Sequence, residues 1–158
     1  MREVDRLRRE LEATFDGDPW YGSPVSRILE GVDASQAAAH PLKGAHSIWE
    51  LVAHMTAWVH ETNRRLRGAA HADPIEGDWP AVTSTSAASW QAAQADLARA
   101  HAALAATLTA MDDADLGRQI GGGQTDANGQ PVTLYRTALG LLQHDAYHAA
   151  QIALLKKA

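Results

Sequence analysis

The sequence His144-Asp145-Ala146-Tyr147-His148, near the C-terminal end of the chain, decides how the fold is interpreted. Two histidines four residues apart on a helix differ by about 40° around its axis, so both side chains point the same way from successive turns. That spacing allows two imidazoles to bind one metal ion. The flanking residues predict a helix that begins near residue 132 and continues almost to residue 158. Such a pair is also common by chance, so a third ligand is needed to support a metal site.

Composition and hydrophobic periodicity predict an all-α protein. The chain has 158 residues, 46% of them hydrophobic, which fits a single domain over residues 1–158 with its own core. Apolar residues also recur with a helical period over residues 3–15, 47–68 and 86–111. We therefore expect four main helices joined by long loops, including one over residues 69–85. The glycine-rich connection before the last helix is a candidate for a small hairpin.

The composition argues against several classes of protein and site. The chain has no cysteine, so disulfides and thiolate metal sites are excluded, and a transition-metal site must use His, Asp or Glu. No apolar run reaches about 18 residues, so no membrane span is expected. The N-terminal residues mix acidic and basic side chains, unlike a signal or transit peptide, and we expect a cytoplasmic protein. The net charge of -5 argues against a nucleic-acid partner.

A third histidine, His54, lies in the middle of the second predicted helix. A helical wheel places it at one edge of the apolar stripe, beside Trp58, where the core meets a polar environment. A histidine at such an edge is more commonly exposed or hydrogen-bonded than bound to metal, so position alone does not identify a ligand. His101 lies on the stripe of the third helix without a spaced partner, and we interpret it as structural.

Asp145 is an anomaly in the last predicted helix. The helical wheel places it in the middle of the apolar face, nearly in line with Leu134 and Ile152. A buried carboxylate costs several kcal/mol unless it is paired or accepts hydrogen bonds. It could orient a metal-binding imidazole through the second ring nitrogen, or it could tether a backbone N–H or hydroxyl of a neighbouring helix. The second interpretation is slightly favoured, because Asp145 and His144 diverge around the helix.

The order and spacing of these features resemble the DinB-like superfamily, and especially its YfiT-like metal-dependent hydrolases. The resemblance covers nearly the whole chain and implies a four-helix bundle. It rests on three segments: 47–54 (Ser-Ile-Trp-Glu-Leu-Val-Ala-His), Ser89-Trp90 and 144–152 (His-Asp-Ala-Tyr-His-Ala-Ala-Gln-Ile). In the family, one histidine of the second helix and two of the fourth bind a single divalent metal. The resemblance therefore implies that His54, His144 and His148 are the metal ligands.

The resemblance implies that the protein is a metal-dependent hydrolase or a thiol S-transferase that acts on a small molecule. Relatives of the second kind use a low-molecular-weight thiol such as bacillithiol, mycothiol or glutathione. We expect one divalent ion, Zn or Ni first, with Fe, Co or Mn as alternatives, because the predicted ligands are all nitrogens. The competing hypothesis is a non-enzymatic stress-related or interaction protein whose metal site is structural or vestigial.

The sequence does not identify catalytic residues beyond the predicted metal ligands. A general base beside the metal would distinguish an enzyme from a structural site. Glu50 and Glu61 lie on the same side of their helix as His54, but neither has a compelling claim to that role. Trp79, in the loop over residues 69–85, either lines a pocket or covers an edge of the core, and both interpretations remain open.

We also predict that the protein is a homodimer. Many relatives dimerise through helices of the bundle, the aromatic segment Trp20-Tyr21 offers apolar surface, and two-fold dimers are the commonest oligomers. Light scattering at high micromolar concentration should therefore give about twice the chain mass. A mass of 16.9 kDa, that of one chain, would contradict the prediction.

Overall fold

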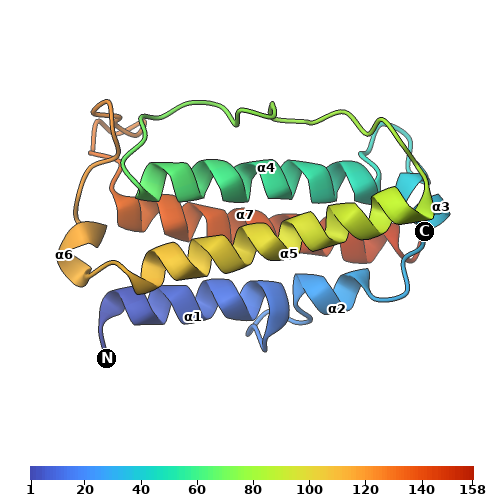
Figure 1. The fold of residues 1–158 in the computed structure, drawn as a ribbon, viewed down its shortest axis with the longest axis horizontal. Coiled ribbons are helices and arrows are strands. Elements are labelled where there is room, and N and C mark those ends of the chain that lie inside the picture. The colour runs from blue at the N-terminus through green and yellow to red at the C-terminus, as the bar shows by residue number, and fades with distance from the viewer.

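A computed structural model describes all residues 1–158 and shows an all-helical chain, as predicted. Figure 1 shows four long helices running side by side along the molecule. These are α1 (Glu3–Asp16), α4 (Ile48–Leu66), α5 (Ala87–Thr109) and α7 (Leu134–Leu155). Three short helices lie in the connections, namely α2 (Val25–Leu29), α3 (Ala34–Ala38) and α6 (Asp113–Leu116). The expected hairpin is reduced to isolated antiparallel bridges, Gln119–Thr133 and Thr125–Pro131.

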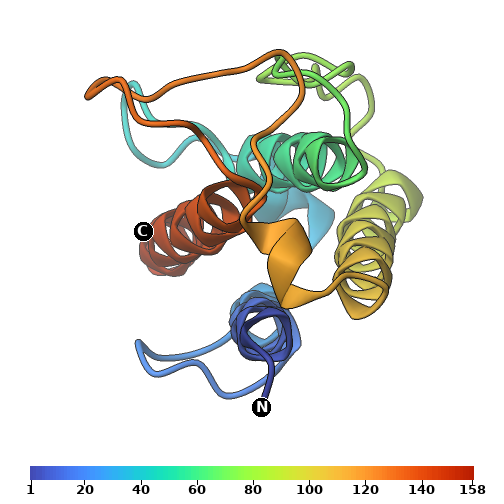
Figure 2. The same ribbon diagram turned by 90° about the vertical axis from the view of Figure 1, so that its left-hand side faces the viewer.

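The long helices form a four-helix bundle in which the second and third helices along the chain run in the same direction. α1 and α7 run one way along the molecule, and α4 and α5 run the opposite way (Figure 1). Seen from the end, the four helices occupy the corners of a square, with α4 diagonal to α1 and α5 diagonal to α7 (Figure 2). The contacting pairs are accordingly α4–α5, α4–α7, α1–α5 and α1–α7. Because α4 and α5 are parallel, the chain must return along the whole length of α4 to begin α5.

The helices begin where polar side chains can satisfy unpaired backbone N–H groups. The capping box predicted at the start of α4 is present: the Ser47 hydroxyl accepts from the N–H of Glu50, and the Glu50 carboxylate accepts from the N–H of Ser47. Ser86 caps α5 and Thr133 caps α7 in the simpler one-sided way. These local signals place the ends of the helices and hence the register of the histidines that they carry.

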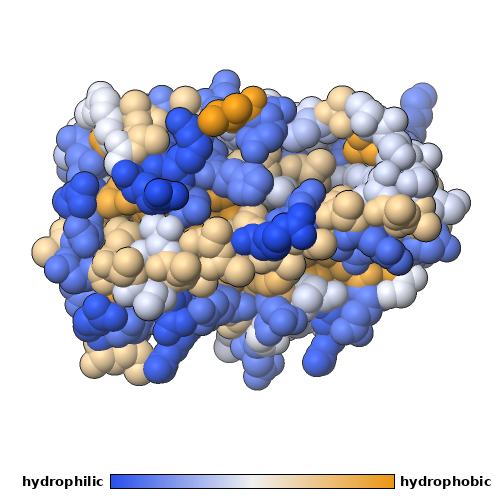
Figure 3. Space-filling view, viewed as in Figure 1, coloured by the Kyte–Doolittle hydropathy of each residue, from blue (hydrophilic) through white to orange (hydrophobic).

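One contiguous cluster of 28 buried apolar residues fills the centre of the bundle, with members from all four long helices. Trp49 and Trp90 meet at a ring-centroid distance of 5.1 Å, and the indole N–H of Trp90 donates to the carbonyl of Val32 at 2.7 Å. The outer surface is more mixed. Figure 3 shows a band of moderately hydrophobic residues across the face on which α5 lies, in keeping with the many alanines of that helix.

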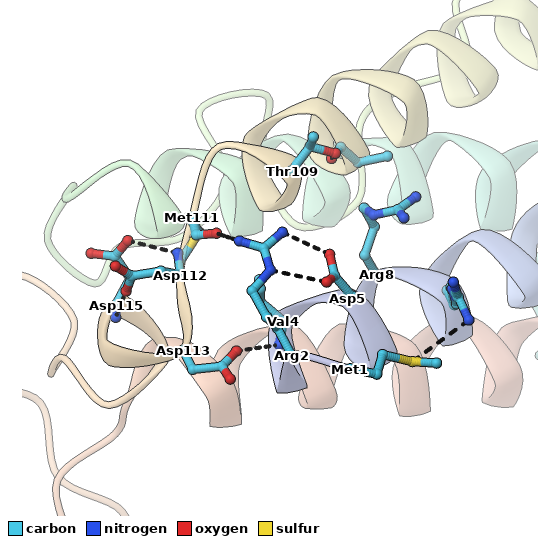
Figure 4. A network of polar contacts seen from close by, with 12 residues as sticks. Met1, Arg2, Val4, Asp5, Arg8, Thr109, Met111, Asp112, Asp113 and Asp115 are labelled. Carbon is cyan, nitrogen blue, oxygen red and sulfur yellow. Dashed lines mark hydrogen bonds and ion pairs between the residues drawn. The ribbon is translucent and has the colours of Figure 1, made fainter.

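A polar network fixes the start of α1 against the corner between α5 and α6 (Figure 4). Arg2 pairs with Asp5 and also donates to the carbonyl of Met111 at 3.2 Å. Asp113 accepts a hydrogen bond from the N–H of Val4 at 2.9 Å. Because the backbone groups at both helix ends would otherwise lack partners, these contacts close one end of the bundle.

The return segment 67–86 lies along the outside of α4 (Figure 1). At its start it meets the connection before α7, where the N–H of His71 donates to the carbonyl of Gly121 at 3.2 Å. Gly121 is required for this approach, because a Cβ there would lie 2.9 Å from backbone atoms of Ala69 and Ala70. The segment thereby brings Asp78 and Trp79 to the middle of α4. No helix in the structure is sufficiently long and apolar to cross a membrane.

Candidate metal centre

α4 and α7 bring His54, His144 and His148 together on the side of the bundle where these two helices meet. The Nε2 atom of His144 lies 2.9 Å from Nε2 of His54 and 3.1 Å from Nε2 of His148. His54 and His148 are buried, and His144 is partly exposed. Two of these residues come from successive turns of one helix, whereas His54 is reached only because α4 packs against α7.

The other ring nitrogens of His54 and His148 are held by oxygen acceptors. Nδ1–H of His54 donates to the backbone carbonyl of Asp78 at 2.5 Å. Nδ1–H of His148 donates to the side-chain oxygen of Gln151 at 2.6 Å. An oxygen of this kind accepts and cannot donate, so both contacts place the imidazole proton on Nδ1. Each ring therefore presents a lone pair on Nε2 toward the centre of the cluster, as a metal ligand does.

The three Nε2 atoms have too few protons for the contacts that they make. His54 and His148 each contribute a lone pair, and a neutral His144 has at most one Nε2 proton to share between two contacts. At least one lone pair therefore faces another lone pair at about 3 Å. That arrangement is unfavourable unless a cation lies among the three nitrogens.

Burial argues against a proton as that cation. Removal from water lowers the pKa of His54 and of His144 below the ordinary histidine value, and lowers the pKa of His148 to about 4. The carbonyl of Asp78 opposes the shift in the pKa of His54, and the Gln151 side chain opposes it at His148, but burial dominates in both. The cluster thus holds neutral imidazoles at neutral pH, the form that binds metals.

The positions of the nitrogens fit a metal ion. Bonds between a metal and imidazole nitrogen are about 2.0–2.1 Å long, so two nitrogens on one ion lie about 3 Å apart. The ligand atoms of the three histidines all lie within 4.8 Å of one another. Three imidazoles suit several divalent first-row metals and do not select among them. The cluster could therefore hold one metal ion.

Behind His144, Asp145 lies fully buried in the middle of the bundle, as the helical wheel predicted. One carboxylate oxygen is 3.6 Å from Nδ1 of His144, and the other is 3.5 Å from Nε2 of His101, which belongs to the diagonal helix α5. None of these atoms has a hydrogen-bond partner. Burial raises the pKa of Asp145 to about 7, and His101 opposes that shift. The predicted tether to a backbone N–H or hydroxyl is thus wrong: neither oxygen accepts a hydrogen bond, and the carboxylate pairs at longer range with two imidazoles.

Trp79 covers the outer side of the cluster. Its ring stacks on His54 with a centroid distance of 3.9 Å and on His46 at 3.5 Å, so it lies between the two imidazoles. Next to it, the carboxylate of Asp78 accepts from the indole N–H of Trp58 at 2.7 Å. Trp79 therefore acts as a cover, as in the second of the two roles considered, but it covers the histidine cluster. The residue is still 39% exposed.

The comparisons with known proteins agree with the helical fold. The sequence model of the DinB superfamily matches residues 24–152, which include all three histidines of the cluster. The chain belongs to the DinB superfamily. No curated protein matches this member of the superfamily.

A solved structure shares the fold of this DinB-superfamily chain. It is the crystal structure of a conserved protein from Enterococcus faecalis, with a TM-score of 0.70 and 13% sequence identity. The similarity covers 99% of this chain and 96% of that one. At this identity the similarity shows the fold, namely the bundle and the path of the chain.

The two carboxylates considered as bases in this DinB-superfamily chain are already engaged. Glu50 accepts from the N–H of Ser47 and contacts His40 at 3.0 Å. Glu61 is buried and pairs with Arg64 and Arg65 at 2.5 and 2.8 Å. Neither carboxylate contacts the histidine cluster.

Sequence reasoning missed the groups that hold the imidazoles of the cluster. Gln151 follows His148 by three residues, a spacing at which helical side chains meet, so it could have been identified. The carbonyl of Asp78 could not have been identified, because it belongs to an irregular loop and acts through its backbone. The remaining histidines, other than the stacked His46 and the buried His101, lie away from the cluster.

Proposed function

We propose that this member of the DinB superfamily binds one divalent metal through His54, His144 and His148 and is a metal-dependent enzyme that acts on a small molecule. The observation that supports the proposal is the convergence of three Nε2 atoms, with two of the rings fixed by oxygen acceptors on Nδ1. Of the two activities considered, we propose thiol S-transfer first and hydrolysis second.

Protein side chains would set the conditions for this chemistry. When bound, the metal would act as a Lewis acid and lower the pKa of a thiol or water that it coordinates. The carbonyl of Asp78 and the side chain of Gln151 keep two ligand rings in the required tautomer. Trp79 shields His54 on its outer side and limits the access of water from that direction.

The carboxylates near the cluster do not face the Nε2 atoms, which favours a thiol over water as the reacting group: Asp78 and Asp145 lie on the Nδ1 sides of His54 and His144. Glu50 and Glu61 are held in other contacts, and Asp78 accepts from Trp58, so none of the three is free to act as a base at the Nε2 atoms. A free thiol has a pKa of about 8.5, far below the value of about 15.7 for bulk water, so it needs less assistance to ionise. In S-transfer the thiol would lose its proton to solvent, and the sulfur would bond to an electrophilic carbon as the leaving group departs with its electron pair.

A conjugation assay tests this proposal. Metal-loaded protein should accelerate the reaction of monochlorobimane with at least one of glutathione, bacillithiol and mycothiol. Protein stripped with a chelator and the His54→Ala variant should give only the uncatalysed rate.

Other outcomes would contradict the thiol assignment. Hydrolysis of p-nitrophenyl acetate without thiol conjugation would favour the second activity. Metal that raises the melting temperature while supporting neither reaction would indicate a structural site and contradict an enzymatic role.

A further inference from the structure

A cavity of about 290 Å³ adjoins the histidine cluster between α4 and α7. His144 and Trp58, which both neighbour His54, form the end of the cavity nearest the cluster. Arg65 of α4 and Arg136 of α7 also line it. The cavity thus has an imidazole of the proposed metal site in its wall together with two guanidinium groups.

The sequence of α7 explains how the cavity and the cluster are aligned. Arg136, Gly140, His144 and His148 follow one another at intervals of four residues, so they form one row along the helix. From Arg136 to His144 the helix rises about 12 Å. A ligand with its reacting group at His144 could therefore extend along this row toward the guanidinium groups.

Gly140 keeps the middle of that row open. It lies inside α7, where glycine costs about 1 kcal/mol relative to alanine. Neither its backbone conformation nor its packing requires glycine: its φ is not positive, and a Cβ would meet no atom within 4 Å. The side chain absent at Gly140 leaves space directly in front of the turn that carries His144.

The guanidinium groups retain free donors. Arg65 donates through Nε to Glu61 at 2.8 Å and through Nη2 to the carbonyl of Ala72 at 2.5 Å, which leaves Nη1 without a protein partner. The Arg65 side chain is only 10% exposed, so the surrounding packing holds this donor in place. Arg136 contacts Asp126 at 3.1 Å through Nη1 and retains its other nitrogens.

Two guanidinium groups line the cavity and no carboxylate does. Glu61 pairs with Arg64 and Arg65, and Asp126 pairs with Arg136. Both of these acids, and Asp78 beside Trp58, lie outside the cavity lining. A ligand in the cavity would therefore meet the guanidinium groups and no carboxylate, which favours an anion.

We propose that the cavity binds the carboxylate of a small substrate through Arg65 and Arg136, with the chain of the substrate lying over Gly140 toward His144. A planar guanidinium matches the geometry of a carboxylate. The inference rests on the proposed function and specifies its substrate class, an elongated molecule with a carboxylate at one end and its reacting group at the other.

Hexanoate and hexanamide are suitable probes, because they have the same shape and differ in charge. In calorimetric titrations of the metal-free protein at low salt, hexanoate should bind at least about tenfold more tightly than hexanamide, because hydrogen bonds to a charged group are worth more than neutral ones. Arg136→Gln should weaken hexanoate binding about tenfold. Gly140→Leu should abolish it, since the new side chain would occupy the cavity.

Matched variants control for nonspecific effects. Arg118→Gln is the control for Arg136→Gln. The two arginines are matched, because Arg118 is 61% exposed and paired with Asp115 and Arg136 is 60% exposed and paired with Asp126. Only Arg136 lines the cavity. Ala150→Leu adds the same side chain to an exposed position of α7 outside the cavity. Both controls should bind hexanoate as the wild type does.

Equal affinities for hexanoate and hexanamide, or equal losses in Arg136→Gln and Arg118→Gln, would overturn the inference. A zinc titration of the wild type separates it from the proposed function. Zinc binding without hexanoate binding would contradict only the carboxylate site. Hexanoate binding with the expected effects of the variants, but without zinc binding, would support the carboxylate site and contradict the proposed metal function.

Discussion

Replacing His54, His144 or His148 by alanine is expected to remove most of the bound metal from the purified protein. Each substitution deletes one of three nitrogens that lie within about 3 Å of a neighbour. Two imidazoles form a much weaker site than three, because one of the bonds to the ion is lost. Elemental analysis after expression with divalent metal and dialysis measures the loss directly.

His60→Ala and His71→Ala are the controls for this experiment. His60 is half-exposed and pairs with Glu76, and His71 lies exposed in the return segment, so both are distant from the cluster. Both variants should retain the metal content of the wild type. Full occupancy in His54→Ala would refute the three-histidine site and, with it, the proposed enzymatic role.

The metal should be retained to lower pH than the ordinary histidine pKa of about 6.5 would suggest. A proton competes with the metal for each Nε2, and burial lowers the pKa of all three rings, that of His148 to about 4. Competition by protons therefore begins only below about pH 6.5 and increases as the pH falls toward 4. Loss of the metal in a single step near pH 6.5 or above would contradict the prediction, because it would show that the rings are hydrated as in a free peptide.

The second large effect is expected for Asp145→Ala, which should lower the free energy of unfolding by about 1–3 kcal/mol. Without the carboxylate, Nδ1 of His144 and Nε2 of His101, which are buried, would lose the anion that lies 3.6 and 3.5 Å from them. The variant should also lose about 10–100-fold in metal affinity, because the ring of His144 loses the carboxylate that lies 3.6 Å from its Nδ1 and orients it. Urea unfolding and a competitive metal titration measure the two quantities separately.

Asp145→Asn and Glu12→Ala complete this comparison. Asparagine keeps one oxygen in place and should give a smaller loss of stability than alanine. Glu12 forms only an exposed ion pair with Arg8, so its removal should be nearly neutral. Equal unfolding midpoints for Asp145→Ala and Glu12→Ala would contradict a stabilising role of the buried carboxylate. Unchanged metal affinity with lowered stability would assign Asp145 to the fold alone.

Much of the bundle follows from the sequence because the interactions that specify helices are local. The capping box at Ser47 and Glu50 and the helical apolar periodicity each depend on residues within a few turns. The common face of His144 and His148 is likewise a property of one helix. The burial of Asp145 could also be predicted, since one side of α7 is otherwise apolar.

Only the tertiary structure decided which groups surround the histidines. His54 meets its partners because α4 packs against α7, and Asp78 reaches His54 because the return segment follows α4 along its length. His101 faces Asp145 across the diagonal of the bundle, a contact that no periodicity on either helix reveals. Helix propensity and capping act over a few residues, whereas these contacts depend on how distant segments pack and on the path of an irregular loop. The sequence by itself therefore determined the helices and which residues could be ligands, and the packing of the helices determined which of them meet.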